Sequence, residues 1–86
     1  MNLTDLHTFS LVAETGTISR AAQRLNVPKS TVSRRVQRLE DALGQALLKR
    51  SPRSVVLTEI GTALYQRSAP SLKELNAAVD AIVDGD

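Results

Sequence analysis

The stretch PKSTVSRRVQRLEDAL, residues 28–43, decides the fold because it separates aliphatic and cationic side chains onto two faces of one helix. The aliphatic side chains recur every three or four residues, the spacing of one α-helical face; they are Val32, Val36, Leu39 and Leu43. The other face carries cations and short hydroxyl side chains, namely Lys29, Arg34, Arg35 and Arg38 with Ser30, Thr31 and Ser33. Such a helix suits insertion into a DNA major groove, although an ordinary solvated helix face has the same pattern.

The charge distribution along the chain favours a polyanionic partner. The net charge is only +2, but residues 20–53 hold nine of the eleven cations and two acids, which gives that segment a charge of +7. Residues 1–19 contribute −2 and residues 54–86 contribute −3. A polyanion is therefore attracted to the middle of the chain and not to its ends.

The composition narrows the function classes. The chain has 86 residues, enough for one small domain, and no cysteine, so neither a disulfide nor a thiolate metal site is possible. The single histidine, His7, cannot form a histidine cluster or a nucleophile–base pair, so we expect no metal, no cofactor and no enzyme activity. Without a signal peptide or a membrane span, we expect a soluble cytoplasmic chain.

Two helices are predicted before the central one. Asn2 caps the first, which runs from Leu3 to about Thr15 and stops at Gly16, with Asp5 completing a capping box. The second helix follows within residues 17–25, where paired alanines permit a close approach to a neighbour. The brief break at residues 26–28 then predicts a helix-turn-helix, against the alternative of a generic three-helix bundle.

A basic hairpin is predicted after the central helix. Gly44 ends that helix, and the β-branched content and turn residues that follow predict a short hairpin, with strands at about 47–50 and 54–57 around the turn Ser51-Pro52-Arg53. Lys49, Arg50 and Arg53 make the hairpin tip basic, so it can reach phosphates or the minor groove as a wing. The alternative is a loop whose arginines only aid solubility.

A long last helix is predicted from Thr58 and Glu59 to about Asp84, with a kink near Pro70 because proline lacks an N–H. The spacing of its aliphatic residues is close to a heptad repeat, and the predicted apolar stripe consists of Leu64, Leu72, Leu75, Val79 and Ile82. From Leu72 onward this stripe is expected to pair with another chain as a dimer; the alternative is an unpaired tail.

The run from residue 17 to residue 61 resembles the N-terminal winged helix-turn-helix domain of LysR-type bacterial transcriptional regulators. The resemblance rests on the AA pair of the second helix, on S-x-V-S-R and RLE-x-x-LG of the third, on L-x-R-x-x-R of the hairpin and on LTE-x-G, which opens the last helix. It implies a mainly α fold with a three-helix core, a short β-hairpin wing and a long C-terminal linker helix. Residues 1–58 would bind DNA, with the helix-turn-helix at about 18–37, and residues 59–86 would dimerise.

The resemblance also implies roles for individual residues. The base-reading residues would be Lys29, Ser30, Ser33 and Arg34. Contacts to the DNA backbone would come from Thr31, Arg35 and Arg38, from Arg50 and Arg53 in the wing, and from Thr58. The partner would be promoter DNA with an interrupted inverted repeat, bound by a homodimer in the bacterial cytoplasm at the nucleoid. Higher oligomers and a small-molecule inducer would involve an effector-binding domain that is absent from this chain.

Two positions depart from the family pattern. Residue 28 is proline where a small polar cap is common, and residue 29 is lysine where glutamine is common. Lys29 would prefer guanine or a phosphate over adenine, so the operator need not follow that of relatives. The main alternative function is a protein-interaction module whose basic patch meets an acidic partner. RNA binding is disfavoured because one Phe and one Tyr are the only aromatic residues.

Overall fold

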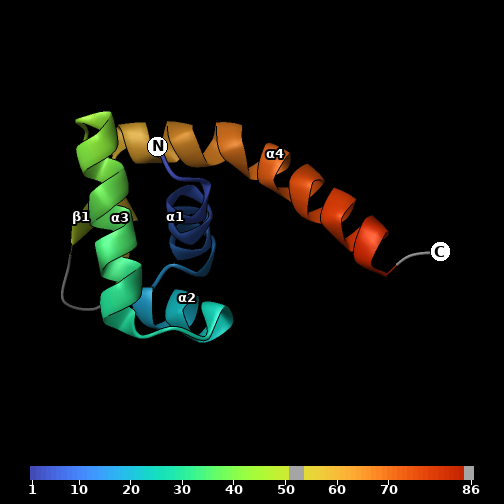
Figure 1. The fold of residues 1–86 in the computed structure, drawn as a ribbon. Coiled ribbons are helices and arrows are strands. Elements are labelled where there is room, and N and C mark those ends of the chain that lie inside the picture. Colours follow the sequence, from blue (N-terminus) through green and yellow to red (C-terminus); the bar gives the residue numbers. More distant parts are fainter. Residues whose placement is uncertain (51–53, 85–86) are drawn as a thin grey trace.

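A computed structural model describes residues 1–50 and 54–84 of the chain. Three helices pack around a common core, a two-stranded hairpin follows, and a long fourth helix extends away from them (Figure 1). The elements are α1 (Leu3–Thr15), α2 (Ile18–Leu25), α3 (Lys29–Leu43), β1 (Leu48–Arg50), β2 (Val55–Leu57) and α4 (Glu59–Val83). The predicted winged helix-turn-helix with a long C-terminal helix is confirmed, and the predicted boundaries hold to within about one residue.

The helix boundaries follow from local capping chemistry. Asn2 Oδ1 accepts a hydrogen bond from the N–H of Thr4 at 2.7 Å, and Thr17 Oγ1 accepts one from the N–H of Arg20 at 3.0 Å. These bonds satisfy donors that the first turns of α1 and α2 leave unpaired. Gly16 (φ 82°) and Gly44 (φ 66°) end α1 and α3 in the left-handed conformation that glycine tolerates best.

The aliphatic face of α3 forms the centre of the core. Val32, Val36 and Leu39 are fully buried against α1 and α2, where Phe9 is the largest buried side chain. The stripe predicted to reach Leu43 stops one turn earlier, because Leu43 is 39% exposed. The first turn of α1 pairs with α3 near Arg38, so the last turn of α3 extends beyond the helix that would cover Leu43.

The hairpin packs beside the end of α1. Strands β1 and β2 are antiparallel, with Leu48 opposite Leu57 and Lys49 opposite Val56. The N–H of Val55 donates to the carbonyl oxygen of Gly16 at 3.2 Å, which fixes β2 beside the end of α1. The predicted tip at Ser51-Pro52-Arg53 lies outside the described residues, as does the side chain of Arg50.

Helix α4 begins in close contact with the segment that leads into β1. Thr58 Oγ1 accepts a hydrogen bond from the N–H of Gly61 at 2.9 Å and donates to the carbonyl oxygen of Ala46 at 2.7 Å. A Cβ on Gly61 would overlap the carbonyl oxygen of Leu47, so only glycine permits this approach. The glycine of the LTE-x-G motif is therefore required by backbone packing.

The second half of α4 leaves the core. The helix is continuous through Pro70, and its axis changes direction near its midpoint (Figure 1). Pro70 removes one intrahelical donor, and the hydroxyl of Ser68 donates to the carbonyl oxygen of Leu64 at 2.7 Å; both features bend helices. Leu72 packs in the core of its own chain at 8% exposure, contrary to the expectation that another chain covers it.

Candidate nucleic-acid interface

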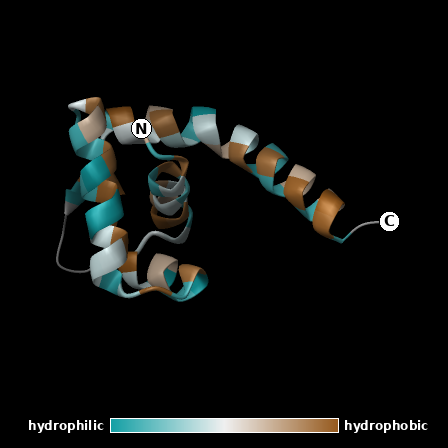
Figure 2. Cartoon of the chain, in the orientation of Figure 1, coloured by the Kyte–Doolittle hydropathy of each residue, from teal (hydrophilic) through white to brown (hydrophobic). Residues whose placement is uncertain are grey.

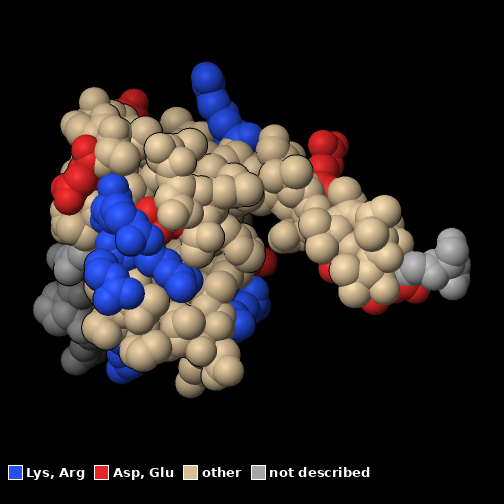
Figure 3. All heavy atoms as spheres, viewed as in Figure 1, with Lys and Arg blue, Asp and Glu red and all other residues tan. Residues whose placement is uncertain are grey.

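The outer face of α3 displays the side chains that the sequence predicted to read bases. Lys29, Ser30 and Arg34 are exposed, whereas Ser33 is half-buried. They share the first two turns of one helix whose opposite face is anchored in the core. Lys and Arg side chains gather over α3 on the face seen in Figure 3. One rigid helix therefore presents a compact set of donors, which suits recognition of an acidic groove.

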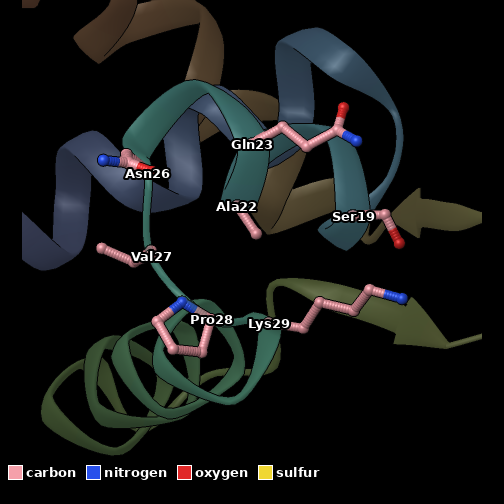
Figure 4. A pocket seen from close by; sticks show the side chains of 7 residues that line it. All are labelled: Ser19, Ala22, Gln23, Asn26, Val27, Pro28 and Lys29. Atoms are coloured by element: carbon pink, nitrogen blue, oxygen red, sulfur yellow. The ribbon is translucent and has the colours of Figure 1, made fainter.

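A hollow beside the helix-turn-helix turn adds two residues that sequence reasoning missed. It has a volume of about 620 Å³ and lies between α2 and the start of α3. Ser19 and Gln23 on α2 and Lys29 on α3 extend toward the same side of this hollow (Figure 4). Both α2 residues lie off the face that carries the buried Ala21 and Ala22. Polar residues on the exposed side of the helix that precedes a cationic helix are the sequence signal that could have identified Ser19 and Gln23.

Arg35 and Arg38 lie on the side of α3 that faces α1. Arg38 forms a two-bond ion pair with Asp5, with Nε to Oδ2 at 2.7 Å and Nη2 to Oδ1 at 2.6 Å. Arg35 Nη1 lies 3.4 Å from Thr8 Oγ1, also on α1. Two of the three arginines on α3 are thus directed to the neighbouring helix. Asp5, predicted to complete a capping box, instead joins α1 to α3 across 33 residues of sequence.

The electrostatics of this ion pair favour the charged forms of both partners. The side chain of Asp5 is only 2% exposed, whereas that of Arg38 is 53% exposed. The hydrogen bonds from Arg38, followed by its positive charge, hold the pKa of Asp5 below its ordinary value, although burial opposes this effect. The same carboxylate raises the pKa of Arg38. Asp5 is therefore a buried, ionised and fully paired carboxylate at neutral pH.

The remaining predicted contacts to the DNA backbone differ in availability. Thr31 is half-buried on the first turn of α3, and Lys49 is exposed on β1. Thr58 has both donors engaged, since its N–H donates to the carbonyl oxygen of Leu47 at 2.9 Å and its hydroxyl to that of Ala46. This argues against the predicted phosphate contact at Thr58. The predicted contacts from Arg50 and Arg53 fall on side chains outside the described residues.

The predicted dimerisation stripe divides into two parts. Leu64 and Leu72 pack against the core of their own chain. Leu75, Val79 and Ile82 are 50%, 60% and 82% exposed, and apolar bands continue along this half of α4 in Figure 2. A groove of about 490 Å³ runs between α1 and α4 and ends beside this exposed stretch. The unpartnered apolar surface therefore begins one turn later than the sequence indicated.

Other kinds of site find no support in the described part of the chain. Within residues 1–50 and 54–84, no three His, Cys, Asp or Glu side chains lie close enough together to hold a metal ion. None of the helices in those ranges combines the length and the apolar character needed to cross a lipid bilayer.

Comparison with known proteins places this arrangement in a family. The family described as bacterial regulatory helix-turn-helix proteins of the lysR family matches residues 3–62, which include the helix-turn-helix, the wing and the start of α4. The chain belongs to this family. Like other LysR-family domains, it combines three core helices, a small antiparallel hairpin and a long last helix.

Curated relatives of this LysR-family chain are transcriptional regulators. It is 48% identical over 83 residues to the regulator IlvY of Escherichia coli, covering 93% of this chain and 28% of IlvY. It is 40% identical over 82 residues to the regulator PgrR of Escherichia coli, covering 95% of this chain and 27% of PgrR. The chain thus spans little more than a quarter of the length of these relatives.

Solved structures share the whole arrangement. Full-length AphB, a virulence activator of Vibrio cholerae, has a TM-score of 0.94 at 38% identity, covering 98% of this chain and 29% of AphB. The CbnR_DBD–DNA complex has a TM-score of 0.83 at 36% identity, covering 93% of this chain and 92% of that one. The complex of BenM_DBD with benA site 1 DNA has a TM-score of 0.84 at 34% identity, with coverages of 93% and 90%.

Proposed function

We propose that this chain binds double-stranded DNA sequence-specifically, as the DNA-binding domain of a LysR-type transcriptional regulator. The observation that carries the proposal is the display of Lys29, Ser30 and Arg34 on one exposed face of α3, opposite the buried Val32 and Val36. The DNA complexes of the similar CbnR and BenM domains support it. On this proposal, residues 1–58 contact DNA and residues 59–86 join two copies.

Helix α3 would lie in the major groove with its N-terminal half against the base edges. The guanidinium fork of Arg34 matches O6 and N7 of guanine, and Lys29 can reach the same acceptors or a phosphate. The hydroxyls of Ser30 and Ser33 can donate to bases or accept from them without crowding the groove. Arg34 has no ion-pair partner among the described residues, so its donors are available for this contact.

Contacts to phosphates would fix the register of α3 on the duplex. Thr31 and Arg35 would reach one strand beside α3, and Ser19 and Gln23 would contact the strand that passes α2. Lys49 and Arg50 would bring the wing to the backbone, and Arg53 would enter the minor groove from its tip, where a narrow groove attracts arginine.

Two copies would associate through the second half of α4. Leu75, Val79 and Ile82 are exposed on one side of that helix, and a two-fold axis would bury the same stripe on both copies. Such a dimer would place two α3 helices on the half-sites of an interrupted inverted repeat. Any higher oligomer would form through an effector-binding domain outside these residues, and a small-molecule inducer would bind to that domain. The regulator would work in the bacterial cytoplasm, at the nucleoid.

Selection of bound duplexes from random DNA tests the proposal. We expect an enriched site of two related half-sites at fixed spacing, and binding that weakens with salt by a log–log slope of about −0.9 per phosphate contacted. No enriched sequence together with a flat salt response would overturn the proposal, and would favour an acidic protein as the partner of the basic surface.

A further inference from the structure

Helix α4 is fixed to the DNA-binding body at one end and free of it at the other. Its first turn is held by the hydrogen bonds of Thr58 and by the close approach of Gly61 to the backbone of Leu47. Leu64 and Tyr65 then pack against the core. From residue 73 to residue 84 every side chain is exposed, and this part carries the apolar stripe proposed to meet a second copy. The direction of α4 between the two parts therefore decides where the second copy lies.

Pro70 is the residue that changes this direction. It lies near the midpoint of α4, where the helix axis bends (Figure 1). Proline has no N–H to donate to the carbonyl oxygen of Gln66, four residues earlier, and its ring pushes that carbonyl away. Pro70 is itself exposed, so its effect is on the backbone and not on core packing. Leu72 is 8% exposed and lines a groove with residues of α1, so the bend carries the second half of α4 toward α1.

The length of the free half makes the bend a long lever. The part of α4 from Pro70 to Val83 is about 20 Å long at the helical rise of about 1.5 Å per residue. A change of direction of about 20° would displace its far end by about 7 Å. That displacement is about two base-pair steps, since successive base pairs are about 3.4 Å apart. In a two-fold dimer the same change occurs in both copies, so it alters the separation and the relative rotation of the two α3 helices.

We propose that Pro70 is a specificity-determining residue, which sets the spacing between the two DNA half-sites by fixing the direction of the second half of α4. Pro70 touches no DNA, and the bases within each half-site are read by α3 whatever the bend. The spacing is read because only one separation of the half-sites lets both α3 helices enter the major groove. This role rests on the proposed function, in which two copies bind an inverted repeat through α4.

A series of duplexes that differ only in the spacer between two inverted half-sites tests this role. The variant Pro70→Ala restores an N–H that can donate to the carbonyl oxygen of Gln66, so α4 should straighten. We expect its preferred spacer to differ from that of the unmodified chain by one base pair or more, with the affinity for a single half-site unchanged. The matched control is Ser71→Ala, because Ser71 is the exposed neighbour of Pro70 on the same helix. It keeps the proline, so it should keep the preferred spacer.

Sedimentation of each variant shows whether the dimer persists. The role of Pro70 is overturned if Pro70→Ala prefers the same spacer as the unmodified chain, or if Ser71→Ala shifts the spacer equally. Loss of the dimer or of single half-site binding in Pro70→Ala would also overturn it, because Pro70 would then act on association or folding and not on spacing. If the unmodified chain shows no preferred spacer at all, the proposed binding to an inverted repeat is itself refuted.

Discussion

Glu40 and Leu47 connect the end of α3 to the start of the wing. Glu40 Oε2 accepts a hydrogen bond from the N–H of Leu47 at 2.7 Å and a longer one from the N–H of Leu48 at 3.2 Å. Leu47 is fully buried, so its N–H depends on this carboxylate. The glutamate of the RLE motif thereby sets the position of the wing relative to α3, the two elements that contact one duplex in the proposed function.

Replacing Glu40 with alanine should destabilise the domain. The buried N–H of Leu47 would lose its acceptor, and an unsatisfied buried donor costs about 1–3 kcal/mol. Urea unfolding followed by circular dichroism measures this loss. Asp41→Ala serves as the control, because Asp41 is exposed and bonds only to Gln37, and such surface changes stay within about 0.5 kcal/mol. Equal midpoints for the two variants would refute the role of Glu40.

Gly61→Ala should also destabilise the domain. The added Cβ would overlap the backbone carbonyl of Leu47, which cannot move aside like a flexible side chain. Overpacking of this kind costs about 1–3 kcal/mol, despite the better helix propensity of alanine. Ser71→Ala, at an exposed position of the same helix, is the control in a thermal unfolding experiment. A stabilised Gly61 variant would mean that α4 does not approach Leu47 this closely.

The ion pair between Asp5 and Arg38 should make stability depend on pH. The folded state holds the pKa of Asp5 below its ordinary value of 3.8. The unfolded chain therefore takes up the proton first as pH falls. The contribution of Asp5 is complete well above pH 3.8 and is lost as the pH falls from that value through the lower, folded pKa.

Asp5→Asn isolates this contribution. The difference in unfolding free energy between the unmodified chain and the variant should be largest near neutral pH and shrink as the solution is acidified below pH 3.8. Urea midpoints measured across that range test it. A difference that stays constant with pH would mean that Asp5 stabilises the fold only through packing.

Arg34→Ala should reduce discrimination between the selected site and random DNA by roughly 1–3 kcal/mol, because a fork on guanine is lost. Fluorescence anisotropy with both duplexes measures the ratio. Arg53→Ala is the comparison, since a wing contact should weaken binding to both duplexes with little change in their ratio. Should Arg34→Ala weaken both equally, Arg34 would contact only phosphates.

Val79→Asp should abolish dimerisation while the first 57 residues stay folded. Val79 is 60% exposed on the second half of α4 and contributes nothing to the core. The substituted aspartate would be buried without a partner once in each copy of a symmetric interface, so the free-energy cost of burying the carboxylate is incurred twice. Sedimentation measures the mass, and Ala77→Asp on the opposite side of the helix is the control. An unchanged dimer for Val79→Asp would remove this stripe from the interface.

Interactions between residues close in sequence were predictable. The caps at Asn2 and Thr17, the stops at Gly16 and Gly44 and the start of α4 at Thr58 each depend on chemistry within a few residues. The buried face of α3 followed from helical periodicity, as did the exposure of Lys29 and Arg34. The sequence alone therefore determined the order of the elements and the winged helix-turn-helix, because each cap, stop and buried face depends on residues within a few positions of one another.

Contacts between distant segments needed the tertiary structure. Nothing near Asp5 in sequence indicates Arg38 as its partner, and the acid suited a cap equally well. Leu72 has the spacing of a dimer seam but is buried by its own chain, whereas Leu75, three residues later, is exposed. The sequence predicted a phosphate contact for Thr58, whereas in the fold its hydroxyl and its N–H donate to the carbonyl oxygens of Ala46 and Leu47. Periodicity says which face a side chain occupies; only the packing of helices decides what that face meets.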